Sequence, residues 1–342
     1  MNRIILISFL MVLSFGAKSQ NSKPSDFKVL FYNLENLFDT YDDTSKWDEQ
    51  FLPDGDKHWT DWKYQTKLKN LSKVITAAGS WQTAAIIGVC EIENAFVLEE
   101  LTTKSPLKKL DYKFIHKESP DRRGIDVALF YQEDQFTPLY YNHIQIDFPF
   151  APQSKTRDIL YVKGITKHND TLHVFVNHWP SRWGGQMKTE AKRIFVAQTL
   201  RKQVDSLFKY SVNPNIIIMG DFNDTPTDKS VVEYLKAYPP IKKPKANTIY
   251  DLMYPLSLTK EGTHPYHGHW AVLDHMIVSS ALLNKKSSIY TNLDSAYPFK
   301  ADFLLEEDTK YGGTKTNRSY IGFKYHGGYS DHLPVILDLF FK

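Results

Sequence analysis

Residues 216–224 read Ile-Ile-Ile-Met-Gly-Asp-Phe-Asn-Asp and follow Pro214 closely. Four apolar residues between a proline and a glycine predict a strand that is buried on both faces. Asp221, Asn223 and Asp224 then stand where this strand reaches water. Carboxylate and amide oxygens suit Mg²⁺ or Mn²⁺, and they can also align an attacking water molecule. The stretch therefore predicts a polar site at a strand end.

Polar side chains also stand at the ends of other apolar runs, or within them. They are Asn33, Glu91, Asn177 with His178, Asp274, and Asp331 with His332. Each alone is best explained as a turn, a cap or a solvated strand end. Together with Asp221 and Asn223 they make six clusters, which are hard to explain as independent turns because buried charge is costly unless it is paired or metal-bound.

The 342 residues are 42% hydrophobic and 14% aromatic, which suffices for a sizeable core in one domain. Helices are predicted after Thr60, ending at Gly79, and over 189–208. Strands outnumber these helices, which favours two packed sheets with helices outside. The predicted strands are 27–32, 84–90, 125–131, 172–176, 215–219, 271–278 and 333–340.

The first 19 residues have the pattern of an export signal. Arg3 gives a positive start, an apolar run follows, and Ala17 and Ser19 suit a cleavage site. A membrane anchor is the alternative, but the run is too short to span a bilayer. We therefore expect a periplasmic or secreted protein whose single domain covers residues 20–342.

Charge and cysteine content exclude some classes of site. The net charge is +3, and removing Arg3 and Lys18 with the leader lowers it to +1, so recognition of a polyanion would have to be local. The single cysteine, Cys90, can form neither an internal disulfide nor a thiolate zinc site, and we expect it to be buried.

The ordered set of polar clusters resembles the endonuclease/exonuclease/phosphatase superfamily, the fold of DNase I, exonuclease III and the sphingomyelinases. Each motif is short, but their order over about residues 27–340 is specific. The resemblance implies a four-layer α/β/β/α sandwich of two packed mixed sheets flanked by helices, with the site at one rim. The motifs are Tyr32-Asn33-Leu34-Glu35-Asn36, Val89-Cys90-Glu91, Gly124-Ile125-Asp126, Asn177-His178-Trp179-Pro180, Gly220-Asp221-Phe222-Asn223 and Ser330-Asp331-His332.

The resemblance implies that Glu91, Asn33 and Asp331 hold a divalent metal ion, with Glu93 as an alternative ligand. Mg²⁺ is expected, Mn²⁺ is an alternative, and Ca²⁺ also suits oxygen ligands. His332 would contact the scissile phosphate or handle a proton, and Asp274 would fix its tautomer.

Three more catalytic residues follow from the resemblance. Asp221 would orient or deprotonate water, Asn223 would contact the phosphate or the transition state, and His178 would be the second phosphate-contacting histidine. The identity of the general base stays open.

The expected substrate-binding residues are Asn177, Arg182, Tyr131 and Asp126. Arg182 could clamp phosphate or lie on the surface, and Tyr131 could contact phosphate or belong to the core. Asp126 would pair with His178 or, alternatively, with a neighbouring arginine.

The stretch His264-Pro265-Tyr266-His267-Gly268-His269-Trp270 matches no motif. Its three histidines could bind a transition metal, or the loop could contact substrate by stacking.

These observations predict an exported, divalent-metal-dependent phosphodiesterase, foremost a nuclease acting on nucleic acid as a monomer. A phospholipid or inositol-phosphate phosphoesterase is the closest alternative. A non-catalytic binding protein on the same fold is disfavoured, because the full set of candidate catalytic residues is present.

Overall fold

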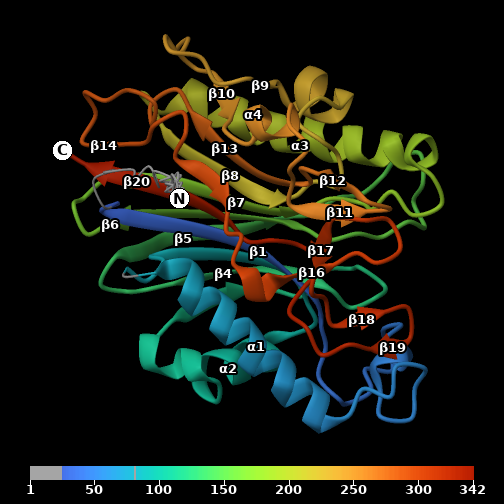
Figure 1. The fold of residues 1–342 in the computed structure, drawn as a ribbon. Helices are drawn as coiled ribbons and strands as arrows, with labels where there is room; N and C mark the ends of the chain where they lie inside the picture. Colours follow the sequence, from blue (N-terminus) through green and yellow to red (C-terminus); the bar gives the residue numbers. More distant parts are fainter. Residues whose placement is uncertain (1–24, 81) are drawn as a thin grey trace, which may run out of the picture.

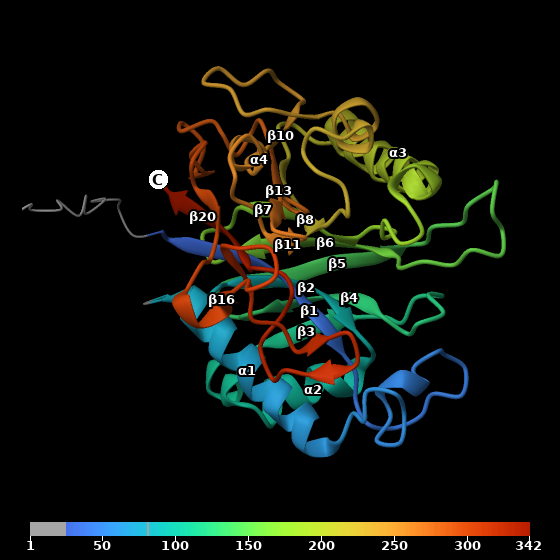
Figure 2. The same cartoon turned by 45° about the vertical axis from the view of Figure 1, so that its right-hand side comes forward.

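Residues 25–80 and 82–342 are described by the computed structural model, and they form two large β-sheets packed face to face (Figures 1 and 2). The predicted leader, residues 1–19, lies outside this part of the chain. Within 25–80 and 82–342, no helix is long and apolar enough to cross a membrane.

The first sheet is built from β1 (Phe27–Leu37), β2 (Ile86–Ile92), β3 (Lys113–His116), β4 (Asp126–Tyr131), β14 (Ile289–Tyr290), β15 (Ala296–Pro298) and β20 (Val335–Phe341). Its order is β14-β20-β1-β2-β4-β3, and β15 also pairs with β20. The sheet is mixed, because β1 is parallel to β2 but antiparallel to β20.

The second sheet is built from β5 (Phe136–Ile144), β6 (Ile159–Thr166), β7 (Thr171–His178), β8 (Asn215–Asp221), β9 (Ala237–Tyr238), β10 (Ile249–Asp251) and β13 (Asp274–Ser279). Its order is β5-β6-β7-β8-β13-β10-β9. This sheet is also mixed, since β7 and β8 are parallel whereas β8 and β13 are antiparallel.

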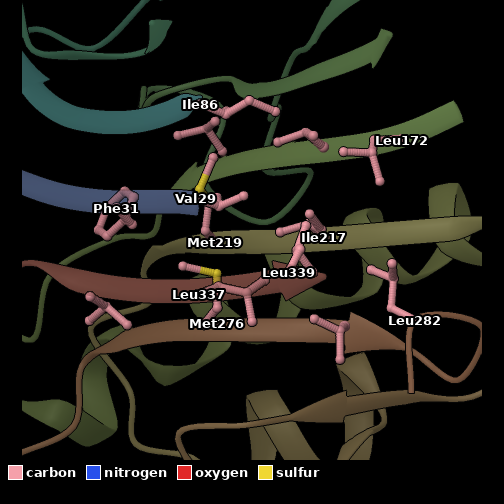
Figure 3. Close-up of a cluster of buried hydrophobic side chains, with 14 of the residues drawn as sticks. Val29, Phe31, Ile86, Leu172, Ile217, Met219, Met276, Leu282, Leu337 and Leu339 are labelled. Carbon is pink, nitrogen blue, oxygen red and sulfur yellow. The ribbon is translucent and has the colours of Figure 1, made fainter. Parts of the chain in front are cut away.

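Apolar side chains from the facing surfaces of the sheets form the central core (Figure 3). On β1, Val29 and Phe31 point into this core, whereas Leu30 and Tyr32 pack on the opposite face of the sheet. Successive strand residues point to opposite faces, and all four side chains are fully buried. This two-sided burial explains why the strand is apolar throughout rather than alternating.

Helices cover the two outer faces. The outer face of the first sheet packs on α1 (Asp61–Gly79) and α2 (Ala95–Thr103), whereas α3 (Gln186–Tyr210) covers the second sheet (Figure 1). A short α4 (Tyr254–Ser257) lies near β10. The four-layer α/β/β/α sandwich is confirmed. The first helix has the predicted limits, and α3 extends beyond the predicted 189–208 at both ends.

Three two-stranded hairpins lie off the main sheets. They are β11 (His264–Tyr266) with β12 (His269–Ala271), β16 (Leu305–Glu307) with β17 (Thr314–Thr316), and β18 (Tyr320–Ile321) with β19 (Lys324–Tyr325). Short helical turns cover Glu49–Phe51, Pro106–Leu110, Ser230–Leu235 and Asp302–Leu304. Much of the long segment 282–324 is therefore ordered structure. Strand β11 carries His264, and the connection between β17 and β18 carries Arg318, to the ends of the main strands.

Candidate active site

Strand direction brings the predicted residues to one rim of the sandwich. β7 and β8 are parallel, so His178 and Asp221 end neighbouring strands and stand in register. β13 runs antiparallel to β8, and its first residue, Asp274, is paired with Asp221 from the other side. In the first sheet, Asn33 of β1 is paired with Cys90, which directly precedes Glu91.

Glu91 occupies an irregular position at the end of β2. Its φ of 59° lies in the left-handed region, and the register shifts between Cys90 and Ile92. Bulges of this kind re-aim side chains and are common beside active sites. The Glu91 Oε2 atom accepts a hydrogen bond from the Asn36 backbone N–H at 2.9 Å. Oε1 faces Asn33, whose Nδ2 donates to Glu91 Oε1 at 3.3 Å and to Asp221 Oδ2 at 3.2 Å.

Asp221 lies at the centre of the site. Its Oδ1 accepts the Asn223 backbone N–H at 2.8 Å. Its Oδ2 lies 3.7 Å from His178 Nε2 and 3.7 Å from His332 Nε2. Burial raises the Asp221 pKa to about 7, although the nearby charge of His332 opposes this shift. Asp221 can therefore exchange a proton near neutral pH.

Gly220 lets the strand carrying Asp221 approach β7 closely. A Cβ atom at this position would lie 2.3 Å from the Asn177 carbonyl oxygen, which real Cβ contacts do not tolerate. The close packing of β8 against β7 therefore requires glycine at the position directly before Asp221.

His332 and Asp274 form a buried pair. His332 Nδ1 donates to Asp274 Oδ2 at 2.7 Å, which leaves Nε2 facing Asp221. Burial lowers the His332 pKa, but the charges of Asp274 and Asp221 outweigh it and hold this pKa well above its usual range. The predicted tautomer-fixing contact of Asp274 is present, and the imidazole carries a positive charge at neutral pH.

His178 has the opposite character. Its Nε2 lies 3.8 Å from Glu91 Oε1, and burial, followed by the charges of Arg157 and Arg123, holds its pKa well below the usual range. Among the described residues, nothing hydrogen-bonds to its Nδ1. A neutral and a charged imidazole therefore flank the same Asp221 oxygen.

Asp126 does not pair with His178. Its Oδ2 lies 3.3 Å from His116 Nε2 and its Oδ1 accepts the Ser119 N–H at 2.9 Å, so the expected partnership was wrong. The alternative ion pair with a neighbouring arginine is also absent from the described contacts.

Tyr131 was expected near the phosphate and lies elsewhere. Strand β4 runs antiparallel to β2, so Tyr131 is paired with Ile86 at the far end of β2. Five strand positions separate Ile86 from Glu91, a distance of about 16 Å. The side chain packs against Phe136 and the central core, as the alternative interpretation proposed.

Arg182 holds the loop that follows β8. Its Nε donates to the Asn223 carbonyl oxygen at 2.6 Å, and its Nη2 contacts Asp224 at 3.0 Å and Asp228 at 2.7 Å. Because its guanidinium group is bonded to these residues, Arg182 positions Asn223 and is not free to bind phosphate. Asn223 has a φ of 52°, and its Nδ2 donates to the Trp179 carbonyl oxygen.

Asn177 is an internal support. It is fully buried, donates to the Met219 carbonyl oxygen at 3.2 Å and accepts from Trp179 Nε1 at 3.2 Å. These contacts hold β7 against β8, so the expected contact with substrate has no support in the structure.

Asp331 lies beside two residues that motif reasoning left without a role. Arg318 Nη2 is 2.8 Å from Asp331 Oδ2, and His264 Nε2 is 3.8 Å from the same oxygen. Burial opposes ionisation, but Arg318 and then His264 hold the Asp331 pKa well below its usual range. The His264 ring also packs against His332, with 4.5 Å between centroids. Arg318 stands in the connection between β17 and β18, which carries no motif, so no sequence signal marked it.

The three histidines of residues 264–269 do not converge. His267 stacks between Tyr266 and Tyr311, and His269 is exposed. Within residues 25–80 and 82–342, only His264 of the three joins a group able to hold a metal. The alternative in which all three histidines bind one metal ion therefore has no support, and the alternative of a substrate-contacting loop stays a prediction.

Acidic and imidazole side chains of the site gather into two groups that could hold a metal ion. Two groups have ligand atoms within 4.8 Å of one another: His264 with Asp331 and His332, and Asp221 with Asp274 and His332. Glu91 belongs to neither group, but its Oε1 shares the Asn33 amide with Asp221. Clustered carboxylates repel one another, and a cation between them relieves this repulsion. Glu93 is directed away, since its Oε2 accepts the Asp39 N–H at 2.7 Å.

Arg157 is a further site residue found only in the structure. It is 5% exposed, and it contacts Asp121 Oδ2 at 3.0 Å and the Trp179 carbonyl oxygen at 2.7 Å. Its position in a loop, without a neighbouring motif, gave no signal in the sequence.

Solved structures with the same fold cover most of the chain. The human nocturnin catalytic domain, solved with a bound sulfate anion, is 16% identical, with a TM-score of 0.55, covering 92% of this chain and 94% of that one. A mannosyl-6-phosphatase from Bacteroides thetaiotaomicron is also 16% identical, with a TM-score of 0.55 and coverage of 92% and 100%. A humanized TDP2 from D. rerio is 14% identical, with a TM-score of 0.54 and coverage of 92% and 98%. At these identities the likeness shows the fold alone.

No curated protein sequence matches the chain significantly. The model of the Endonuclease/Exonuclease/phosphatase family, in contrast, matches residues 28–340. This match includes every strand of both sheets apart from the first residue of β1 and the last of β20. The chain therefore belongs to the Endonuclease/Exonuclease/phosphatase family.

Proposed function

We propose that the protein hydrolyses phosphodiesters with the help of a divalent metal ion, and that nucleic acid is its substrate. The observation that carries the proposal is the position of Asp221 between His178 and His332. One buried carboxylate with a pKa near 7 faces a charged imidazole on one side and a neutral one on the other. Groups poised to exchange protons and bind anions are what hydrolysis of a phosphate ester requires.

Each residue has a role in this scheme. Asp221 Oδ2 accepts a proton from the attacking water, whose oxygen forms the new bond to phosphorus as the ester bond breaks. The leaving oxygen keeps the electron pair of that bond and takes up a proton from solvent water. His332, held by Asp274, presents a charged Nε2–H to the phosphate oxygens. His178 presents a neutral imidazole to the same space. Asp221 acts as the base here because His332 is already protonated.

Glu91, Asn33 and Asp331 would hold the metal ion, and Mg²⁺ suits their oxygen atoms. When bound, the ion neutralises charge on the phosphate oxygens and so favours attack by water. The Arg318 contact keeps Asp331 ionised and engages one of its two carboxylate oxygens.

A substrate panel with and without chelator tests the proposal. It contains single-stranded and duplex DNA, RNA, bis(p-nitrophenyl) phosphate, sphingomyelin, inositol phosphates and mannose 6-phosphate. We expect chelator-sensitive cleavage of nucleic acid and of the aryl diester. Hydrolysis confined to the lipid, the inositol phosphates or the sugar monoester would overturn the nuclease assignment.

We also propose that the protein is exported and that residues 1–19 are removed. The support is the charged start, apolar run and small residues of this segment. N-terminal sequencing of protein isolated from the periplasm and the medium tests this. Recovery of the intact chain from the cytoplasm alone would contradict export.

A further inference from the structure

Two hollows share lining residues on the surface near Trp179. One has a volume of about 310 Å³ and is lined by Trp47, Arg122 and Arg123 among others. The other has a volume of about 190 Å³ and is lined by Arg123, Trp183 and Lys192 among others. Both are also lined by Ser154 and Lys155, so the two hollows adjoin one another. We call the pair the basic groove.

Cations outnumber carboxylates along the basic groove. Five cationic side chains line it, namely Arg122, Arg123, Lys155, Arg157 and Lys192. Asp121 is the carboxylate among its lining residues, and it is already paired with Arg157 at 3.0 Å. Asp147 pairs with Lys155 at 3.2 Å, but both side chains are solvent-exposed and such a contact is weak. The groove therefore offers positive charge to an anionic ligand, despite the nearly neutral chain.

One buried donor in the groove lacks a partner. Arg157 is 5% exposed, and its Nε has no hydrogen-bond partner among the described residues. A buried N–H without a partner costs free energy unless a ligand or water satisfies it. The two other guanidinium nitrogens of Arg157 are committed to Asp121 and the Trp179 carbonyl oxygen.

Exposed tryptophans stand in both hollows. Trp183 is 90% exposed and Trp47 is 61% exposed. The Arg122 guanidinium lies over Trp47 with 5.3 Å to the ring centroid. Large exposed rings beside cations form a surface on which nucleic-acid bases stack while phosphates meet positive charge.

The basic groove opens beside the site. The Trp179 carbonyl oxygen accepts from Arg157 in the groove wall and from Nδ2 of Asn223. Pro180 and Ser181 line the second hollow, and they follow His178 and Trp179 directly in the chain. A chain bound in the groove would therefore continue into the catalytic residues.

We propose that the basic groove binds the nucleotides flanking the scissile phosphate of a single-stranded nucleic acid. Bases stack on Trp183 and Trp47, while phosphates contact Lys155 and Lys192. The inference rests on the proposed function, whose substrate class it narrows. Single strands fit because their base faces are free to stack, whereas duplex bases are already stacked on one another.

The test compares two substrates. A single-stranded oligonucleotide long enough to fill the groove is cleaved alongside bis(p-nitrophenyl) phosphate, which is too small to reach it. The variants are Trp183→Ala and the double variant Lys155→Ala/Lys192→Ala. Matched controls are Tyr210→Ala and Lys209→Ala, exposed residues at the C-terminal end of α3, whereas Lys192 lies in its first half. Thermal unfolding midpoints confirm that every variant is folded.

For the oligonucleotide, we expect Trp183→Ala to lower kcat/KM about 5- to 100-fold, mainly through KM. The double lysine variant should also lower kcat/KM for the oligonucleotide. It should reduce the slope of log affinity against log salt concentration by about 0.7 for each lost phosphate contact. Hydrolysis of the aryl diester should stay unchanged in all variants, and the controls should match wild type on both substrates.

The outcomes separate the two proposals. If wild type cleaves neither substrate, the proposed function fails. If it cleaves both and the groove variants cleave the oligonucleotide like wild type, only the groove inference is overturned. Binding of the groove to vesicles of anionic phospholipid, lost in the same variants while oligonucleotide cleavage is retained, would also overturn it.

Discussion

His332 Nδ1 lies 2.7 Å from Asp274 Oδ2, and this contact joins the C-terminal segment of the chain to the start of β13. The bond fixes the imidazole so that its other nitrogen faces Asp221 at 3.7 Å. Because Asp274 is fully buried, its charge acts at short range and with little screening by solvent. The pair thus sets both the orientation and the protonation of the histidine.

Replacing Asp274 with Asn should lower kcat on the order of 100- to 10,000-fold, as the loss of a charged histidine partner does in other hydrolases. The variant also removes the charge that raises the His332 pKa. The alkaline limb of the pH–rate profile should therefore move to lower pH. A profile of kcat/KM against pH measures this shift. If the alkaline limb stays at the same pH in the variant, His332 does not determine that limb.

Asp221 should make the protein less stable as the pH rises. An unfolded aspartate loses its proton near pH 4, whereas folded Asp221 loses it near pH 7. Between these values the folded state binds the extra proton, so the free energy of unfolding falls as the pH rises, and the loss persists above pH 7. Asp221→Asn should thus stabilise the metal-free protein by a few kcal/mol at pH 8 and by much less at pH 4, while abolishing activity.

Thermal unfolding in chelator at both pH values measures this effect. Equal shifts at pH 4 and pH 8 would mean that the raised pKa of Asp221 is not the cause.

Glu91→Gln should weaken metal binding at least 10-fold, because a neutral amide replaces a charged oxygen ligand. The matched control is Glu93→Gln. Burial raises the Glu93 pKa to about 8, so this side chain is already neutral at pH 7 and the substitution changes little. Titration with Mn²⁺ followed by electron paramagnetic resonance measures the affinity directly. Equal affinities of the two variants would remove Glu91 from the ligand set.

Gly220→Ala should destabilise the fold by about 2 kcal/mol or more, since its Cβ would meet the Asn177 carbonyl oxygen at 2.3 Å. Gly79→Ala is the control, because its Cβ would have only an ordinary contact at 3.8 Å. Denaturant unfolding compares the two variants. A Gly220→Ala protein as stable as the control would contradict the close approach of β7 and β8.

The sequence predicted the fold well, because strands buried on both faces leave continuous apolar runs such as residues 29–32. It also predicted the central residues Asp221, Asp274 and His332, whose motifs lie at strand ends or beginnings. The direction of neighbouring strands was harder to predict. Tyr131 shows this, because the antiparallel pairing of β4 places it at the far end of the sheet from Glu91.

Two residues beside the motifs were assigned to substrate binding, although their side chains hydrogen-bond to the backbone around the catalytic residues. Arg182 and Asn177 stand beside catalytic residues in the chain, yet their polar atoms hold the backbone in place. Arg157 and Arg318 were not predicted, because no motif lies near either of them in the sequence. They reach the site through tertiary contacts from segments with no motif, and their partners Asp121 and Asp331 are distant in sequence.

The most direct measurement is the rate of bis(p-nitrophenyl) phosphate hydrolysis by wild type and His332→Ala, each with Mg²⁺ and with chelator. Lys209→Ala serves as a folded control. We predict Mg²⁺-dependent turnover by wild type and Lys209→Ala, and loss of that turnover in His332→Ala at an unchanged fold. A folded His332→Ala protein that hydrolyses the diester at the wild-type rate would contradict the assigned active site.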